Sequence, residues 1–155
     1  MGYDGVAWRA DPLDAARVYW LDAFTANIDR TWRNPNLLVW HRRLWLIDHG
    51  ASLYFHHAWS GWREASRRPF ATVHDHVLLP FAGAVPEADA ALGPLLTPET
   101  LAEVLAAIPD EWLDGEPGFR GVDEVRSAYA EFLSARLEEP RGWARDLQEA
   151  HETAV

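Results

Sequence analysis

Hydrophobic and polar positions near the start of the chain repeat with the spacing of an amphipathic helix. Asp11 followed by Pro12 is a typical helix start, because a carboxylate can cap the first turn and proline is tolerated at the first helical position. Apolar side chains then recur at intervals of three and four residues, at Leu13, Ala16, Tyr19, Trp20, Ala23 and Phe24. The pattern predicts a helix over residues 12–27.

The pattern changes to that of a loop and a β-hairpin over residues 28–48. Residues 28–35 are polar and end in Pro35, which disfavours helical geometry at the residue before it. Two short apolar runs, NLLVW at 36–40 and LWLID at 44–48, then flank His41, Arg42 and Arg43. The entry to the first strand and the exit from the second lie at the same end of a two-stranded ribbon. We therefore expect Asp29 and Asp48 to face one space.

Apolar periodicity beyond Gly50 is weaker. Residues 52–59 and 73–84 have near-helical spacing, although Pro80 interrupts the second segment. Residues 85–98 contain three prolines and many alanines, a composition that we interpret as a connector. These features predict two short helical segments followed by an irregular stretch.

Three helix starts can be recognised in the remainder of the chain. Thr97 and Pro98 predict a capped helix that ends near residue 108. Asp123 predicts the cap of a longer helix to about residue 138, and Pro140 opens a last amphipathic helix. The chain shows no internal repeat. The predicted fold class is mostly α with a small β-hairpin, in a single domain that spans residues 1–155.

Composition and charge restrict the classes of partner and compartment. With 24 acidic and 14 basic residues the chain has a formal net charge of −10, which would repel the phosphate backbone of a nucleic acid. The chain contains no cysteine, which is compatible with a reducing cytoplasm. No apolar stretch in it approaches the ~20 residues that span a bilayer. We expect a cytoplasmic protein that contacts neither nucleic acid nor membrane. Nine tryptophans predict an aromatic core around residues 8–62.

Three oxygen-bearing side chains around the predicted hairpin form a candidate catalytic site. Asp29 precedes Asn34 by five residues, and Asp48 follows Asn34 by fourteen, in a turn with the sequence IDHG. Phosphoryl transfer requires a carboxylate that accepts the proton of the attacking hydroxyl, and oxygen ligands that hold Mg²⁺ on the phosphates. These three side chains offer both. Gly50 would allow an unusual backbone after Asp48, and Asn36 is a second candidate for the amide ligand.

The segment NIDRTWRNPNLLVWHRRLWLIDHG, residues 27–50, resembles the catalytic core of HipA-like kinases in the protein-kinase-like superfamily, especially compact actinobacterial members. The resemblance extends over roughly residues 13–137 and implies the fold of a kinase C-terminal lobe. It implies that Asp29 is the catalytic base of a serine/threonine-type kinase, and that Asn34 and Asp48 bind Mg²⁺. The implied reaction is Mg-ATP-dependent phosphotransfer to a hydroxyl of a protein or small molecule.

The same resemblance implies how ATP is held. Ile47 directly precedes Asp48, and we group both with Asp29 and Asn34 as residues that contact the ATP cofactor. Kinases of this superfamily grip the phosphates with a glycine-rich loop and a lysine, and this chain has neither. The resemblance therefore implies that the N-terminal ATP-gripping lobe is absent here: either the sequence is a fragment or a shortened gene product, or a partner chain or a homodimer covers the place of that lobe. Arg30 and Trp32 stand where many relatives have small or histidine residues, so the resemblance implies that they restrict the access of a substrate hydroxyl.

Two other functions remain open from the sequence. The first is a non-catalytic, pseudokinase-like interaction module that binds a partner through an exposed apolar surface. The second is a histidine-based metallohydrolase, because two pairs of imidazoles from neighbouring segments could close a tetrahedral zinc site. The four histidines of that site would be His56, His57, His74 and His76.

Overall fold

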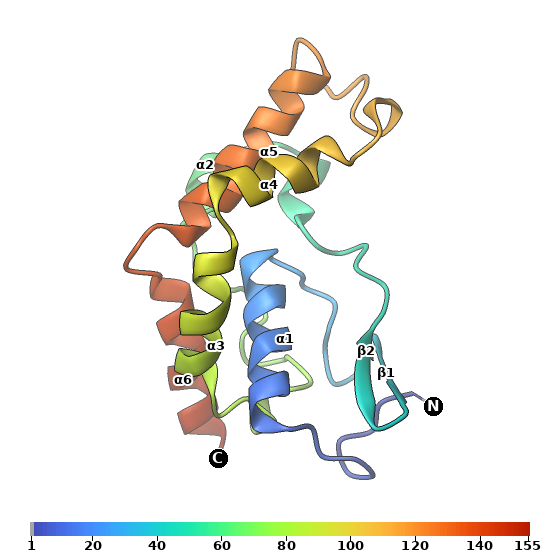
Figure 1. Ribbon diagram of the computed structural model, residues 1–155, viewed down its shortest axis with the longest axis vertical. Helices are drawn as coiled ribbons and strands as arrows, with labels where there is room; N and C mark the ends of the chain where they lie inside the picture. Colours follow the sequence, from blue (N-terminus) through green and yellow to red (C-terminus); the bar gives the residue numbers. More distant parts are fainter. Residues whose placement is uncertain (1) are drawn as a thin grey trace.

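The computed structural model describes residues 2–155, which form a mostly helical fold with one two-stranded antiparallel sheet (Figure 1). The α-helices are α1 (Pro12–Phe24), α2 (Trp62–Ala65), α3 (Val85–Leu92), α4 (Pro98–Ala106), α5 (Val122–Leu137) and α6 (Gly142–Ala154). The strands are β1 (Leu37–Trp40) and β2 (Arg43–Leu46), and 3₁₀ turns lie at Tyr54–His57, Leu79–Phe81, Gly93–Leu95 and Asp110–Trp112. None of the helices in this part of the chain has the length and apolar composition that crossing a membrane requires.

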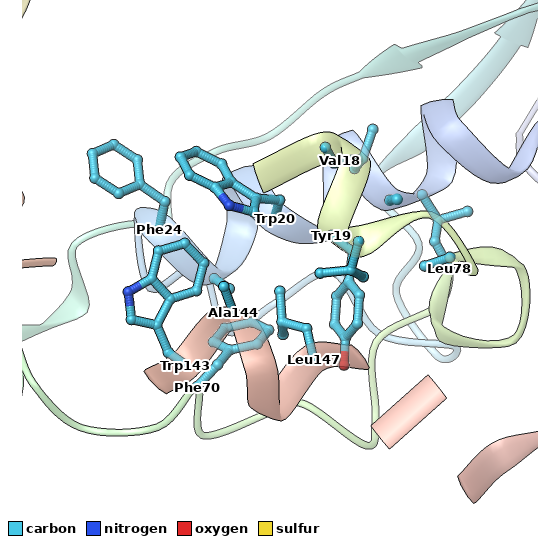
Figure 2. Close-up of a cluster of buried hydrophobic side chains, with 14 of the residues drawn as sticks. Val18, Tyr19, Trp20, Phe24, Phe70, Leu78, Trp143, Ala144 and Leu147 are labelled. Atoms are coloured by element: carbon cyan, nitrogen blue, oxygen red, sulfur yellow. The ribbon is translucent and has the colours of Figure 1, made fainter. Parts of the chain in front are cut away.

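Helices α1, α3 and α6 pack side by side, and α4 and α5 cross at the other end of the molecule (Figure 1). Asp11 caps α1, because its carboxylate accepts hydrogen bonds from two N–H groups of the first turn at 3.0 and 3.2 Å. The inward face of α1 packs against α6, as Figure 2 shows for Trp20 and Phe24 beside Trp143. Burying each of these aromatic side chains stabilises the fold by roughly 2–3 kcal/mol.

A polar contact also ties these three helices together. Trp20 of α1 donates its Nε1–H to Asp89 of α3 at 2.6 Å, and Arg141, at the start of α6, donates to both oxygens of the same carboxylate at 2.8 and 2.9 Å. Burial raises the pKa of Asp89, but the hydrogen bonds from Arg141 and Trp20 outweigh burial and hold that pKa below its usual value. Asp89 is therefore ionised at neutral pH and fixes the helices against one another.

The predicted hairpin is present, with a tighter turn than expected. Only His41 and Arg42 form the loop, both with positive φ (48° and 60°), which is the geometry of a two-residue hairpin turn. Arg43 therefore pairs with Trp40 instead of lying in the loop, and the strands end at Leu46 instead of reaching residue 48. Leu37 is buried against the core, and β1 is flanked by Gly2, which forms an isolated bridge with Leu38.

Several predicted element boundaries are wrong. The first helix ends at Phe24 instead of residue 27, because Thr25 caps it and Ala26 turns the chain with φ of 53°. The helical segments expected at 52–59 and 73–84 contain only the 3₁₀ turns Tyr54–His57 and Leu79–Phe81. Helix α4 does begin at Pro98 after a Thr97 cap. Helix α5 begins after Gly121, so that Asp123 lies in its first turn instead of capping it, and α6 begins at Gly142 instead of Pro140.

The predicted connector over 85–98 is also wrong, because its first half is helix α3. Pro86 lies in the first turn of α3, where its missing N–H costs nothing, and the alanines that follow are strong helix formers. Gly93 and Pro94 then end the α-helix in a 3₁₀ turn. The prolines that indicated a connector are thus the start and stop signals of a short helix.

The tryptophans do not all join one core. Trp20 and Trp62 are buried, but Trp32, Trp40 and Trp45 are 63%, 59% and 48% exposed. The expectation of an aromatic core around residues 8–62 is therefore wrong for the loop and the hairpin. Trp40 and Trp45 project into solvent because the hairpin buries only one of its two faces, and Trp32 lies in the loop before the hairpin.

A buried ion pair connects α1 to the loop that follows it. The Asp22 carboxylate on α1 accepts hydrogen bonds from Arg30, at Nε and, at 3.4 Å, from Nη2, and both side chains have 0% exposure. His76 lies 3.1 Å from the same carboxylate through Nε2. The N–H of Leu78 donates to His76 Nδ1 at 3.2 Å, so Nδ1 is an acceptor and Nε2 carries the hydrogen donated to Asp22. The cluster is therefore an Arg30–Asp22 ion pair joined by a neutral imidazole.

Two pKa shifts agree with this assignment. Burial alone would raise the pKa of Asp22, but the hydrogen bonds from His76 and Arg30 outweigh burial and hold the pKa below its usual value. Burial lowers the pKa of His76, although its hydrogen bond to Asp22 opposes this change. At neutral pH the carboxylate is ionised and the imidazole is neutral.

Removing the charge of Asp22 should destabilise the fold strongly. The Asp22→Asn substitution leaves the guanidinium of Arg30 buried without a counter-ion, which costs roughly 3–5 kcal/mol of unfolding free energy. Denaturant unfolding measures this loss. Asp14→Asn, on the exposed side of the same helix, is the matched control and should change the unfolding free energy by less than about 0.5 kcal/mol. Equal effects of the two substitutions would contradict the ion-pair interpretation.

Acid should destabilise the fold through His76 before it reaches Asp22. Both folded-state pKa values lie below their ordinary values, so each group stabilises the fold above its ordinary pKa and loses that contribution as the pH falls. We expect the unfolding free energy to decrease between about pH 7 and pH 5 as unfolded His76 gains a proton, and further below about pH 4 through Asp22. His76→Gln should reduce the first decrease. An unchanged pH profile in that variant would contradict the neutral, buried imidazole.

Candidate functional site

The loop that carries Asp29 is fixed by the residues on either side of it. Asn27 is buried and donates its Nδ2–H to Asp22 at 2.8 Å, and Arg30 pairs with the same carboxylate. The Asn27 side-chain oxygen accepts the N–H of Asp29 at 3.3 Å. Because positions 27 and 30 both point inward, the backbone holds Asp29 between them with its side chain only partly buried.

Two asparagines orient the Asp29 carboxylate. Asn34 donates its Nδ2–H to Asp29 Oδ2 at 2.8 Å, and Asn36 donates to the same oxygen at 3.3 Å and to the Asp29 carbonyl at 3.2 Å. Asp29 Oδ1 and Asn34 Oδ1 have no hydrogen-bond partner within residues 2–155. The structure therefore brings Asp29 and Asn34 together and leaves one oxygen of each available. Asn36 uses its side-chain N–H groups and its backbone carbonyl to hold the loop and is only partly exposed, whereas Asn34 is exposed, so Asn34 is the better candidate ligand.

The segment that carries Asp48 lies against the same loop. The N–H of Ile47 donates to the Asn36 carbonyl at 3.0 Å, which extends the strand pairing of the hairpin by one bond. Ile47 is 40% exposed, and Asp48 is exposed. Asp48 Oδ1 accepts the N–H of Gly50 at 3.3 Å, and its Oδ2 has no partner among the described residues. Asp48 is thus presented at the loop end of the hairpin, as its sequence position predicts.

Arg30 clamps the two segments together. Its Nη1 donates to the carbonyl of Asn36 and, at 3.4 Å, to the carbonyl of Ile47, and its Nη2 lies 3.5 Å from His49 Nδ1. One guanidinium, fully buried, therefore contacts both the loop after Asp29 and the residues on both sides of Asp48. Its position next to Asp29 suggested from the sequence that it restricts access to the site. The structure places it beneath the site instead, where it acts as support.

The backbone strain lies at Asp48 itself. Its φ is 51°, in the left-handed region that residues other than glycine rarely adopt, whereas Gly50 does not have a positive φ. The expectation that Gly50 supplies the unusual backbone is therefore wrong. A Cβ at Gly50 would lie 3.3 Å from Asp48 Oδ1, so glycine there leaves room for the close approach of the carboxylate. Such left-handed conformations occur where the surrounding structure imposes them, as the Arg30 contacts do here.

The free oxygens at this site are of the type that binds a hard cation. Neither Asp29 nor Asp48 forms an ion pair with any residue in the described part of the chain, so their charges are not neutralised by protein. Carboxylate and amide oxygens are the ligands that Mg²⁺ prefers. The structure brings Asp29 and Asn34 into contact and places Asp48 on the neighbouring turn, and these are ligand types that Mg²⁺ takes, usually one or two protein carboxylates together with phosphate oxygens.

The histidines proposed for a zinc site are engaged elsewhere. His76 uses both ring nitrogens in the core, and His56 Nδ1 forms a 2.9 Å hydrogen bond with the hydroxyl of Tyr129 on α5. Burial lowers the pKa of His56, as does the neighbouring His57. Residues 2–155 contain no group of three or more His, Asp or Glu side chains arranged to hold a metal ion. The zinc interpretation gains no support from this arrangement.

A cleft of about 1130 Å³ lies away from the candidate site. Residues 58–63 and 117–131 line it, and none of Asp29, Asn34 and Asp48 does. Its charged side chains are already paired, Arg63 with Glu131 and Arg120 with Glu124. Its lining includes Trp59, which has a positive φ of 52° as Asp48 has one of 51°, but the carboxylate oxygens without a partner in residues 2–155 lie at the hairpin.

Sequence reasoning missed the support beneath the site. Asp22 and Asn27 hold the loop in place and were not predicted as site residues, and His76, which completes the cluster, was predicted only as a zinc ligand. One signal was present: Asp22 lies three and four residues after Tyr19 and Val18, on the face of α1 that the hydrophobic pattern assigns to the core. A carboxylate on such a face needs a buried partner, and Arg30 is the nearest arginine that follows it.

Comparison of the chain with protein-family models, with curated proteins and with solved structures found no match.

Proposed function

We propose that the chain is the catalytic and metal-binding half of a HipA-like phosphotransferase with the architecture of a kinase C-terminal lobe. The observation that carries the proposal is the Arg30 clamp, which holds the loop of Asp29 and Asn34 against the turn of Asp48. Two sequence segments with the spacing of a phosphotransfer site are thereby joined by a fully buried guanidinium. A pair of unrelated surface loops would not need such support.

Each residue has a role that its contacts support. Asp29 is the general base: its Oδ2 is held by two amides, and its Oδ1 is free to accept the proton of a substrate hydroxyl. Asn34 Oδ1 and Asp48 Oδ2 are the oxygens that would hold Mg²⁺. Ile47 offers an exposed apolar surface next to them. Mg-ATP, when bound, supplies the phosphoryl group that is transferred to a hydroxyl of a protein or small molecule.

The grip on the outer phosphates must come from another polypeptide segment. The chain has no lysine, the buried Arg30 pairs with Asp22, and Arg33 lies over the exposed ring of Trp32. We therefore place the ATP-gripping function on further chain or on a partner subunit that faces Asp48. In this arrangement the chain positions the base and the cation, and the second segment positions the nucleotide.

A non-catalytic interaction module is the second candidate, and the exposed aromatic side chains of the hairpin favour it. Trp40 and Trp45 lie with ring centroids 5.5 Å apart on the surface, an arrangement more typical of a binding site than of a solvated strand. In such a module the contacts of Arg30 would only maintain the fold of the loop and the turn and would not support catalysis. Metal and nucleotide binding at Asp48 distinguish the two candidates.

A hard cation should bind at the hairpin end of the site. Mn²⁺ replaces Mg²⁺ at oxygen sites and broadens the NMR signals of nearby amides. We expect selective broadening of residues 29–36 and 47–50, and at least a tenfold weaker apparent affinity in Asp48→Asn, since even residues that only support a ligand have effects of about that size. Asp114→Asn, another exposed aspartate that accepts a hydrogen bond from a nearby glycine, is the matched control. Broadening that Asp48→Asn leaves unchanged would contradict the proposed ligand.

Mg-ATP should stabilise the protein, and the two aspartates should differ in their effects. A ligand that binds only the folded state raises Tm by mass action, so Mg-ATP should raise it and Asp48→Asn should abolish the increase. Asp29→Asn should keep the increase, because Asp29 acts on the substrate hydroxyl, but should lower phosphotransfer by roughly 10²–10⁴-fold. Differential scanning fluorimetry and ADP release measure the two effects. Absence of any stabilisation, with or without the ATP-gripping segment, favours the interaction module.

A further inference from the structure

One face of the hairpin is apolar, aromatic and exposed. The strand register places Leu38 opposite Trp45, and Trp40 opposite Arg43, and all four side chains are on the face that points away from the core. We call this surface, with the turn residue Arg42, the hairpin face. The alternate side chains of the same strands pack inward, so the exposure is a property of one face and not of a poorly packed hairpin.

The arginines of the hairpin face have no counter-ion. Arg42 and Arg43 form no ion pair and no side-chain hydrogen bond with any of residues 2–155. Arg33, in the preceding loop, also lacks an ion pair and lies over the exposed ring of Trp32 at 4.6 Å. In a chain with a net charge of −10 and 24 acidic side chains, this is a local excess of positive charge. A partner for this surface should be acidic and should present apolar side chains.

The same chain carries a surface of that kind at its other end. Sixteen of its 24 acidic residues lie in positions 85–155. There, Glu103 and Val104 on α4, and Glu111 and Trp112 on the following 3₁₀ turn, are all exposed, Val104 and Trp112 to 58% and 76%. Neither glutamate has a basic partner within the described part of the chain. We call this surface the acidic face.

The acidic face is a rigid element. Arg126 of α5 donates to the carbonyls of Leu105 and Ile108 at 3.3 and 2.7 Å and to the carboxylate of Asp110 at 2.6 Å. These bonds fix the end of α4 and the 3₁₀ turn to α5. A preformed surface loses less conformational entropy on binding than a mobile loop does.

We propose that the hairpin face of one protomer docks on the acidic face of a second copy of this chain, and that a two-fold axis repeats the contact in the opposite direction. The proposal is independent of the phosphotransfer function. Two-fold symmetry uses each face once per protomer, closes the assembly and doubles the area buried by a single contact. A specific interface of about 1,200–2,000 Å² can be reached in this way from two modest contacts. Pairing of two hairpin faces would instead oppose arginine to arginine.

The contact combines two contributions that experiments can separate. Trp40, Trp45 and Trp112 supply apolar area, which is little affected by salt, whereas the arginine and glutamate side chains supply attraction that salt screens. The dimer should therefore weaken, without vanishing, as ionic strength rises. A contact that was only aromatic would lack this dependence on salt.

Sedimentation velocity on the full chain, from micromolar to near-millimolar concentration, tests the proposal. We expect a monomer–dimer equilibrium. Arg42→Glu combined with Arg43→Glu should raise the dimer Kd at least about tenfold, and so should Glu103→Arg combined with Glu111→Arg, because each places like charges opposite one another. Trp40→Ser combined with Trp45→Ser should also weaken the dimer. Arg9→Glu combined with Arg68→Glu makes the same change in net charge at two other exposed arginines without ion pairs and should leave Kd unchanged.

Mixing the two charge-reversed variants provides the decisive measurement. In the mixed dimer one contact joins two reversed faces and the other joins two native faces, so both are complementary and association should recover. Far-ultraviolet circular dichroism confirms that each variant is folded. A monomer at all concentrations overturns the proposal, as does a dimer insensitive to the hairpin substitutions, or a mixture that fails to associate. A monomer that binds a separate acidic polypeptide through the hairpin face also overturns it.

Discussion

The arrangement of the site depends on the buried ion pair between Asp22 and Arg30. An ion pair with no exposure contributes little net stability, because removing both charges from water costs several kcal/mol per ion and the attraction between them largely offsets that cost. Its main effect is on position. Asp22 lies on a rigid helix and fixes the guanidinium, and the remaining donors of Arg30 fix the carbonyls of Asn36 and Ile47. The helix thus determines where Asp29 and Asp48 lie. His76 completes the hydrogen bonds of the carboxylate without adding charge, which keeps the cluster neutral overall.

Local signals in the sequence were sufficient for most of the fold. The Asp11 cap, the Thr97 cap and the paired apolar runs of the hairpin depend on residues a few positions apart, and each predicted an element that the structure contains. The prediction was wrong where one residue type has two meanings. Proline breaks a helix from within but begins one from its first turn, and at Pro86 it begins α3. Which meaning applies depended on whether Val85 and Ala88 found a buried surface on α1, and a contact between distant segments is not encoded in a local pattern.

For the candidate site, too, only part could be predicted from local sequence. The sequence predicts that Asp29, Asn34 and Asp48 lie at one end of the hairpin, because a loop before one strand and a turn after its neighbour meet at the same end. The buried residues that support the site could not be predicted, since the sequence position of Arg30 suggests that it lies on the surface of the site. Only the fold reveals that positions 27 and 30 point inward and position 29 outward. The tryptophans show the reverse error: their size indicated a core, but alternation along β1 and β2 directs Trp40 and Trp45 into solvent.

That alternation links the two surfaces of the hairpin. The inner face packs on the core, so substitutions there would disturb the fold, and the backbone N–H of Ile47, bonded to the Asn36 carbonyl, holds the segment before Asp48 in place. The outer face does not pack on the core. Exposing its apolar side chains to water is unfavourable unless a partner covers them. Positive charge at the hairpin and negative charge on α4 and the following turn lie at separate places on the same chain. A partner on the outer face would stiffen the strands that carry Asp48, because both faces share one backbone. In the proposed dimer, association and the geometry of the site would therefore be coupled through the hairpin, although no residue belongs to both.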